Sequence, residues 1–238
     1  MALRTNGCTV VLLGHVGVGK TSICQAIKGE PVSETYLPTI DNDFAVQFTR
    51  NNTTYHVNVI DTAGQTQFST IDPQLLNIDY GFIIVFSQAT NTSLLMVQDI
   101  LDKLEFQFGD LDSISIAIVC NGKYMTPSVT EEGIVANIER AKSRFYRTSA
   151  VKEAAGVNRM FQDVVMRMEK KMSGEDPDAM NGDMTNPLKE VFLDAKDSAQ
   201  AGANAAGSGS GSSGSGSGAA NAGNADAAGE KKGYCNIM

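Results

Sequence analysis

An eight-residue segment near the start of the chain constrains the fold more than any other feature: Gly14-His15-Val16-Gly17-Val18-Gly19-Lys20-Thr21. Before it comes a short apolar run, residues 8–13, that is typical of a buried strand. After it, residues 21–28 are typical of a helix that ends at a Gly-Glu-Pro sequence. The segment matches the phosphate-binding pattern G-x-x-x-x-G-K-[ST] in the strand-and-helix context that this pattern requires. A strand, a glycine-rich loop and a helix are therefore predicted here.

This loop predicts a site for a nucleoside triphosphate with Mg²⁺. Its backbone N–H groups are expected to point at phosphate oxygens, and the helix N-terminus adds partial positive charge. Lys20 is expected to reach the β- and γ-phosphates, and the Thr21 hydroxyl is expected to bind Mg²⁺. The predicted nucleotide-binding residues of this segment are Gly14, Val16, Gly17, Val18, Gly19, Lys20, Thr21 and Ser22.

Strand-like and helix-like segments alternate over residues 8–171. Two period-two segments flank a turn at residues 50–52 and predict a hairpin. The predicted strands are residues 8–13, 44–48, 55–60, 81–86, 114–120 and 145–148, and the predicted helices are residues 21–28, 92–108, 129–143 and 157–171. This alternation favours an α/β fold in which a six-stranded, mostly parallel sheet carries helices on both faces. Ligands of such sheets bind outside the carboxyl ends of the strands.

The composition changes sharply near residue 172. We expect an N-terminal extension at residues 1–7, one domain at residues 8–171 and a flexible tail at residues 172–234. The tail should be disordered because its Gly-, Ala- and Ser-rich part buries too little apolar surface to offset chain entropy. For residues 187–196 two alternatives stay open, a short helix or a transient one without a partner. The net charge of −8 and the lack of a basic face argue against a nucleic-acid partner.

The last four residues are Cys235-Asn236-Ile237-Met238. They match the C-a-a-X prenylation pattern, and a final Met favours a farnesyl group on Cys235, attached by farnesyltransferase. Only Lys231 and Lys232 are basic nearby, and a single lipid chain gives marginal, reversible binding. We therefore expect weak attachment to the cytoplasmic face of membranes, either endomembranes or the plasma membrane.

Two further motifs give the chain a family resemblance. Tyr36-Leu37-Pro38-Thr39-Ile40 lies on a polar loop before the predicted hairpin, and Asp61-Thr62-Ala63-Gly64-Gln65 follows the second strand of that hairpin. Together with the phosphate loop they resemble the switch I and switch II regions of Ras-superfamily small GTPases. The resemblance covers residues 8–171 and lies in the Ras, Rap and Rheb group. The segment at residues 38–44 and the terminal Cys-Asn-Ile-Met look most like the Rheb branch.

The resemblance implies a role for each switch residue. Thr39 would join Thr21 on Mg²⁺ and sense the γ-phosphate, and Asp61 would hold a metal-bound water. The Gly64 N–H would contact the γ-phosphate, and Gln65 would orient the attacking water. The implied sets are catalytic residues Gln65, Lys20 and Gly64, metal-site residues Thr21, Thr39 and Asp61, and further nucleotide contacts at Tyr36, Pro38, Thr39, Asp61 and Gly64.

The implied activity is hydrolysis of GTP to GDP and phosphate by a signalling switch. The resemblance also implies partners: effector proteins at switch I and switch II, an exchange factor and a GTPase-activating protein.

The predicted base-binding residues depart from the family pattern. Where small GTPases carry N-K-x-D and S-A-K, this chain has Asn121-Gly122-Lys123-Tyr124 and Ser149-Ala150-Val151. Tyr124 offers one phenolic oxygen in place of a bidentate carboxylate, which predicts weaker guanine affinity and lower guanine selectivity. The alternative is a one-residue shift through which Lys123 and nearby backbone recover normal binding. The base-side candidates are Asn121, Lys123, Ser149 and Ala150.

Val16 is a second departure, because Ras itself has glycine at this place. Bulk here resembles a substitution that blocks an arginine finger, which contributes about 10³–10⁵ in rate. We expect slow hydrolysis and a bias toward the triphosphate-bound form. The alternative function is a Ras-like scaffold that binds effectors but holds nucleotide loosely or does not hydrolyse it. A P-loop kinase is disfavoured because no lid or acceptor-site motif is visible.

Overall fold

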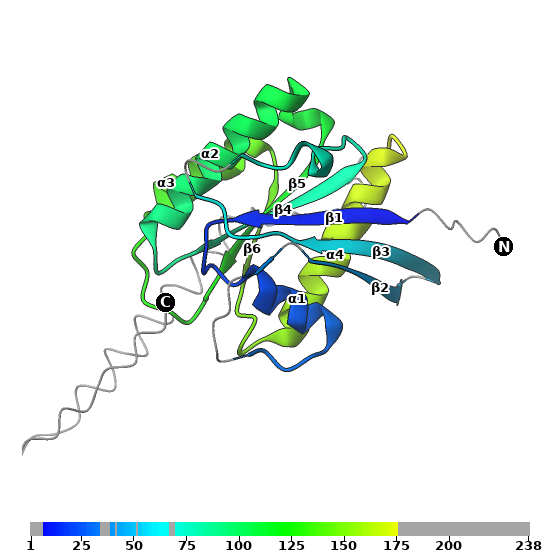
Figure 1. Ribbon diagram of the computed structural model, residues 1–238, viewed down its shortest axis with the longest axis horizontal. Coiled ribbons are helices and arrows are strands. Elements are labelled where there is room, and N and C mark those ends of the chain that lie inside the picture. Colours follow the sequence, from blue (N-terminus) through cyan, green and yellow to red (C-terminus); the bar gives the residue numbers. More distant parts are fainter. Residues whose placement is uncertain (1–6, 34–38, 41, 51, 67–69, 176–238) are drawn as a thin grey trace, which may run out of the picture. The chain divides into compact units, whose positions relative to one another are not determined.

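The computed structural model describes residues 7–33, 39–40, 42–50, 52–66 and 70–175, where strands and helices alternate (Figure 1). The strands are β1 (Cys8–Gly14), β2 (Asn42–Arg50), β3 (Thr53–Asp61), β4 (Tyr80–Ser87), β5 (Ser115–Asn121) and β6 (Arg144–Thr148). The α-helices are α1 (Lys20–Lys28), α2 (Asn91–Phe108), α3 (Glu131–Ala141) and α4 (Ala154–Met172). Two short 3₁₀ helices, η1 (Pro73–Leu75) and η2 (Leu111–Ser113), precede β4 and β5.

The six strands form one sheet in the order β2-β3-β1-β4-β5-β6. Among the strands of the described residues, only the β2–β3 hairpin is antiparallel, and every other neighbouring pair is parallel. In the centre of the sheet, Val11 of β1 lies opposite Ile60 of β3 and Phe82 of β4. The predicted α/β architecture with a six-stranded, mostly parallel sheet is confirmed. The parallel order brings the carboxyl ends of β1, β3, β4, β5 and β6 to one edge of the sheet.

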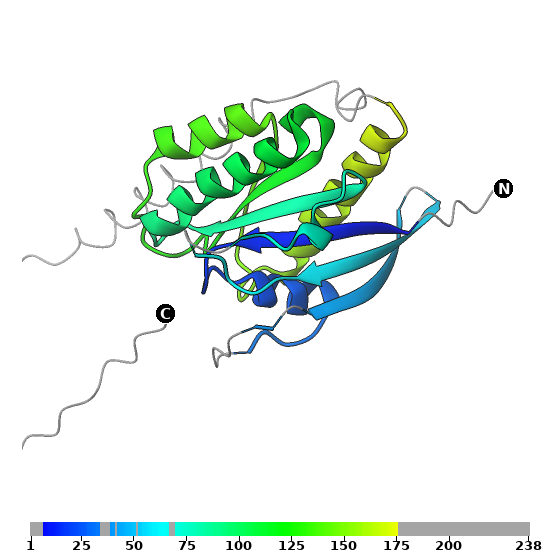
Figure 2. The ribbon, with the colours of Figure 1, turned by 45° about the horizontal axis from the view of Figure 1, so that its top comes forward.

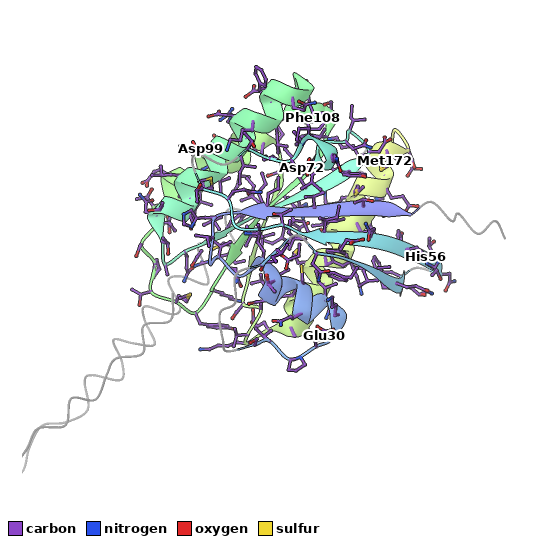
Figure 3. All side chains as sticks on the ribbon, in the orientation of Figure 1. Glu30, His56, Asp72, Asp99, Phe108 and Met172 are labelled. Atoms are coloured by element: carbon purple, nitrogen blue, oxygen red, sulfur yellow. The ribbon has the colours of Figure 1, made fainter. Side chains whose placement is uncertain are left out.

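Helices cover both faces of the sheet (Figure 2). The helices α1 and α4 pack against each other and share a core with one face, which includes Leu12, Ile23 and Phe161. The helices α2 and α3 pack together on the other face. The central strands are therefore buried on both sides, which explains why their sequences are apolar without alternation. Exposed polar side chains such as Glu30 and His56 lie at the outer margins of the view (Figure 3).

Several boundaries differ from the predicted ones. The helix expected from residue 129 begins at Glu131, because the Thr130 hydroxyl caps it by accepting from the Gly133 N–H at 3.3 Å. The last helix begins at Ala154, three residues earlier than predicted, and the final strand begins at Arg144. Ile114, expected in the fifth strand, instead closes η2, where its N–H donates to the Leu111 carbonyl.

Some predictions fall on residues that the structure does not describe. These are residues 1–6 of the expected extension, most of the tail including residues 187–196, and the prenylation motif with Cys235. Within the described ranges, no helix combines the length and the apolar character needed to cross a bilayer.

Candidate functional site

The phosphate loop joins the end of β1 to the start of α1. Lys20, the first residue of α1, is buried, and its Nζ donates to the Gly14 carbonyl at 2.9 Å and the His15 carbonyl at 3.1 Å. Gly19 has a left-handed backbone with φ 91°, and a Cβ there would lie 2.2 Å from the amide nitrogen of Asn121. Only glycine fits this position. The predicted loop and lysine are thus held in one compact turn.

Asn121, at the end of β5, ties the phosphate loop to the predicted base-binding segments. Its amide nitrogen donates to the Val18 carbonyl at 2.9 Å, and its Oδ1 accepts from the Ala150 N–H at 3.2 Å. Ser149 is buried beside it, and its Oγ accepts from the Lys152 N–H at 3.3 Å. The structure therefore brings together the phosphate loop, Asn121 and the Ser149–Ala150 pair, as the sequence predicts.

Two hydroxyl groups and one carboxylate provide oxygen donors beside the loop. Thr21 Oγ1 on α1 and Thr39 Oγ1 lie 2.6 Å apart, although these residues are far apart in sequence. Asp61 is buried at the end of β3. Mg²⁺ prefers oxygen ligands and keeps several of its bound waters, so a site with only a few protein oxygens suits it. Within the described residues no cluster of three His, Cys, Asp or Glu exists that could hold a metal instead. Tyr36 and Pro38 lie outside the described residues.

The start of the second switch segment packs on the phosphate loop. A Cβ added to Gly64 would lie 2.4 Å from Cα of Val16, so the two backbones are in direct contact. Val16 itself is 43% exposed. Gly64 therefore lies at the loop as predicted, and the Val16 side chain projects from the same contact toward solvent.

Gln65 adopts a geometry that the sequence does not predict. Its backbone N–H donates to the Gly14 carbonyl at 3.0 Å, and its side-chain Oε1 accepts from the Gly14 N–H at 2.8 Å. The side chain is buried, and Nε2 lies 3.5 Å from Thr62 Oγ1. The amide oxygen expected to accept from an attacking water is thus engaged with the end of β1. The structure places Gln65 at the site but turns its side chain inward.

The base loop, residues 121–125, is fixed by contacts that sequence reasoning missed. Gln88, the residue directly after β4, is 2% exposed, and its Nε2 donates to the Lys123 carbonyl at 3.1 Å and to the Met125 carbonyl. Arg147 of β6 donates to the Gln88 amide oxygen. The only sequence signal for Gln88 is a polar residue directly after an apolar strand.

Tyr124 points toward the start of α4. Its hydroxyl donates to Glu153 Oε1 at 2.5 Å, and the same oxygen lies 3.8 Å from Lys123 Nζ. The Nζ atoms of Lys123 and Lys152 lie 5.8 and 5.1 Å from the centre of the Tyr124 ring. Glu153 is a second residue that sequence reasoning missed.

The cysteines near the site are unsuited to nucleophilic chemistry. Burial raises the pKa of the Cys24 thiol on α1 far above its usual range, and nearby Asp61 raises it further. Burial also raises the pKa of Cys120 on β5 to about 11. Because the thiolate is the nucleophile, both thiols are inert at neutral pH. The chemistry of this site therefore rests on the lysine, the hydroxyls, the carboxylates and backbone N–H groups.

Comparisons with known proteins agree with this geometry. The sequence profile of the Ras family matches residues 9–170. The GTP-binding protein Rheb of Homo sapiens is 33% identical over 165 residues, which cover 68% of this chain and 88% of the human protein. The GTP-binding protein rhb1 of Schizosaccharomyces pombe is 27% identical over 170 residues, covering 71% of this chain and 91% of that protein. The Ras-like protein rasS of Dictyostelium discoideum is 26% identical over 186 residues, covering 76% and 94% respectively.

Proposed function

Because this chain belongs to the Ras family of small GTPases, in its Rheb branch, we propose that it is a Mg²⁺-dependent GTP–GDP switch with slow hydrolysis. The family supports a GTP-binding signalling GTPase, and the remaining details rest on this chain's own residues. The observation that carries the proposal is the meeting of Thr21 and Thr39, whose hydroxyl oxygens lie 2.6 Å apart beside the buried Lys20.

The phosphate loop binds and orients the triphosphate in this proposal. Lys20 neutralises charge on the β- and γ-phosphates, while loop N–H groups donate to phosphate oxygens. Bound Mg²⁺ would neutralise charge that develops on the phosphates, and Thr21, Thr39 and Asp61 would hold it, the last through a water. Thr39 and Gly64 contact the γ-phosphate, so its loss on hydrolysis releases both switch segments.

Two features of this chain support slow hydrolysis. The Gln65 side chain is held by the Gly14 N–H and is not presented to an attacking water. Val16 projects from the loop where a partner's arginine would have to enter. Each feature removes a contribution to transition-state stabilisation, so we propose a chain that stays in the GTP-bound form for longer than is usual in the family.

The proposal extends to partners and membranes. Switch I and switch II bind effectors in the GTP-bound form, and an exchange factor and a GTPase-activating protein set the ratio of the two forms. Farnesyltransferase acts on Cys235, and the resulting lipid tethers the domain to the cytoplasmic face of endomembranes or the plasma membrane. The sequence pattern of the last four residues supports this tether.

The inward Gln65 and the altered base loop favour one second candidate, a scaffold that binds effectors without turnover. Chromatography of the nucleotide released from freshly purified full-length protein separates the two. Recovered GDP or GTP, together with Mg²⁺-dependent phosphate release from added GTP, supports the switch. Bound GTP that is never hydrolysed, or the absence of any bound nucleotide, supports the scaffold. Thr21→Ala serves as the matched variant, and it should weaken the Mg²⁺ dependence.

Guanine selectivity has its own test. We propose that the missing aspartate weakens guanine binding and narrows the preference for GTP over ATP. Competition of unlabelled GTP and ATP against a fluorescent GTP analogue measures this preference. Picomolar to nanomolar GTP binding with the usual selectivity of the family would contradict the proposal.

A further inference from the structure

The buried side chain of Gln88 holds the base loop through its amide nitrogen. Nε2 donates to the Lys123 carbonyl at 3.1 Å and to the Met125 carbonyl, and these two bonds use both of its hydrogens. The backbone carbonyl of Gln88 accepts from the Ser128 N–H at 2.7 Å, just beyond the loop. Gln88 therefore holds the loop only while its amide nitrogen, and not its amide oxygen, faces the two carbonyls.

The two ends of a glutamine amide have nearly the same shape, so the groups around it decide which end faces the loop. The carbonyls of Lys123 and Met125 are acceptors. A flipped Gln88 amide would point its oxygen at them, and three oxygens would meet with no proton between them. Buried acceptors without a donor are costly. The orientation that holds the loop is thus favoured further by any donor placed at the oxygen end of the amide.

Arg147 of β6 supplies this donor. Its Nη2 donates to Gln88 Oε1. A guanidinium carries donors only and stays charged, so it cannot stabilise the flipped amide, and its hydrogen bond is stronger than one between neutral groups. In the β5–β6 ladder Arg147 lies opposite Cys120, which directly precedes the base loop. The strand pairing therefore places the guanidinium where it can fix the amide of Gln88.

The base loop is also tied to the phosphate loop, so its order bears on the whole nucleotide site. Asn121, its first residue, donates to the Val18 carbonyl at 2.9 Å and accepts from the Ala150 N–H at 3.2 Å. The Lys123 N–H donates to the Thr148 carbonyl at 3.1 Å. Backbone groups of residues 148–150 thus hold the first half of the loop. The Arg147–Gln88 pair extends this support to its last residue.

We propose that Arg147 is a positioning residue that slows release of the guanine nucleotide, because it fixes the Gln88 amide that holds the base loop. The inference rests on the proposed function, since it concerns release of the nucleotide assigned there. Arg147 lies outside the residues that the N-K-x-D and S-A-K patterns name. Its effect passes through Gln88 and requires no contact with the nucleotide.

The first test measures release of a fluorescent GDP analogue from the full-length protein. Arg147→Met keeps much of the length of the side chain but removes every donor, and the dissociation rate should rise roughly 5-fold. Release of a fluorescent GTP analogue should rise by the same factor, because the base loop acts on the base and not on the γ-phosphate. Arg147→Lys keeps a charged donor and should restore part of the slow release.

A matched control comes from the same strand. Arg144→Met makes the same substitution at the other end of β6, opposite Ala117, and should leave the dissociation rate unchanged. A lowered melting temperature in Arg147→Met with an unchanged dissociation rate would mean that Arg147 only supports the fold, and the inference would be wrong.

The second test asks whether Arg147 acts through Gln88. Once Gln88→Leu has removed the amide, the guanidinium has nothing to position. The double variant should therefore release GDP within about 2-fold of the rate of Gln88→Leu alone, since residues that act through one contact are not additive. A double variant whose rate equals the product of the two separate effects would show that Arg147 acts independently of Gln88, which would overturn the inference.

Hydrogen exchange separates this inference from the proposed function. In the full-length protein stripped of nucleotide, Arg147→Met should speed exchange of the Lys123 and Met125 amides relative to the unaltered chain. Unchanged exchange of both amides would show that Arg147 does not order the loop, and the inference would fail. Failure of the unaltered protein to bind either nucleotide would overturn the proposed function, whatever the exchange shows.

Discussion

At the scale of single residues, the first question is whether the Gln65 side chain acts in catalysis or stabilises the fold. Its Oε1 accepts from the Gly14 N–H at 2.8 Å, and its own backbone N–H donates to the Gly14 carbonyl. Gln65 therefore makes two hydrogen bonds with the last residue of β1. A leucine of similar size would keep the backbone bond but leave the buried Gly14 N–H without its acceptor. The cost of such a loss is about 1–3 kcal/mol.

Gln65→Leu should therefore lower the free energy of unfolding by about 1–3 kcal/mol while changing the intrinsic rate of GTP hydrolysis little. Urea unfolding of the GDP-bound protein measures the first quantity, and phosphate release from the GTP-loaded protein measures the second. A large fall in hydrolysis with unchanged stability would show that the side chain turns outward during turnover, as the family pattern implies.

Val16 is the second residue whose replacement has a defined expected effect on hydrolysis. It contacts Gly64 through its backbone, so its side chain adds bulk at the point where the switch segment meets the phosphate loop. Val16→Gly removes this bulk, and the rate of GTP hydrolysis should therefore rise several-fold. Single-turnover phosphate release measures the effect, with Ile78→Gly, at another exposed apolar position, as the control. An unchanged rate would mean that the position of Gln65, and not bulk at Val16, limits turnover.

At the scale of elements, the candidate functional residues lie mostly in the connections between strands and helices. The strands are the elements that the sequence predicts best. The period-two hairpin, the apolar central strands and the phosphate loop could be predicted because each follows from local pattern and sequence spacing. The roles of Gln88 and Glu153 could not, because each depends on a contact between separate elements. The rotamer of Gln65 could not be predicted for the same reason. The start of α3 also differs from the predicted one, because the Thr130 side chain caps the helix and α3 begins at the next residue, Glu131.

The connection between β5 and α3 gives a prediction at this scale. Gln88 holds two carbonyls of the base loop, so Gln88→Leu should release the loop while leaving the phosphate loop intact. The dissociation rate of a fluorescent GDP analogue should rise roughly 10-fold, as expected for the loss of one or two buried hydrogen bonds. Gln98→Leu, on the exposed face of α2, is the matched control. An unchanged dissociation rate would show that the base loop is held by its own turn alone.

At the scale of the whole molecule, nucleotide state and membrane binding are expected to be separable. The site is built from the carboxyl ends of the strands and from loops within residues 14–153, whereas the prenylation motif is at residues 235–238. About 60 residues of Gly-, Ala- and Ser-rich sequence lie between the last described residue, Glu175, and this motif. Because the two sites share no residues, we expect a change at one of them to leave equilibrium binding at the other unaltered.

Cys235→Ser should therefore abolish membrane association and leave GDP affinity unchanged. Met238→Leu should exchange the farnesyl group for the longer geranylgeranyl group. Because each buried CH₂ adds about 0.8 kcal/mol, this variant should partition more strongly into membranes than the unaltered chain. Intact-mass measurement identifies the lipid, and fractionation of cells expressing each variant measures the membrane-bound share. Membrane association that persists in Cys235→Ser would place the anchor elsewhere in the chain, and a GDP affinity that changed with the lipid would show that the two ends are coupled.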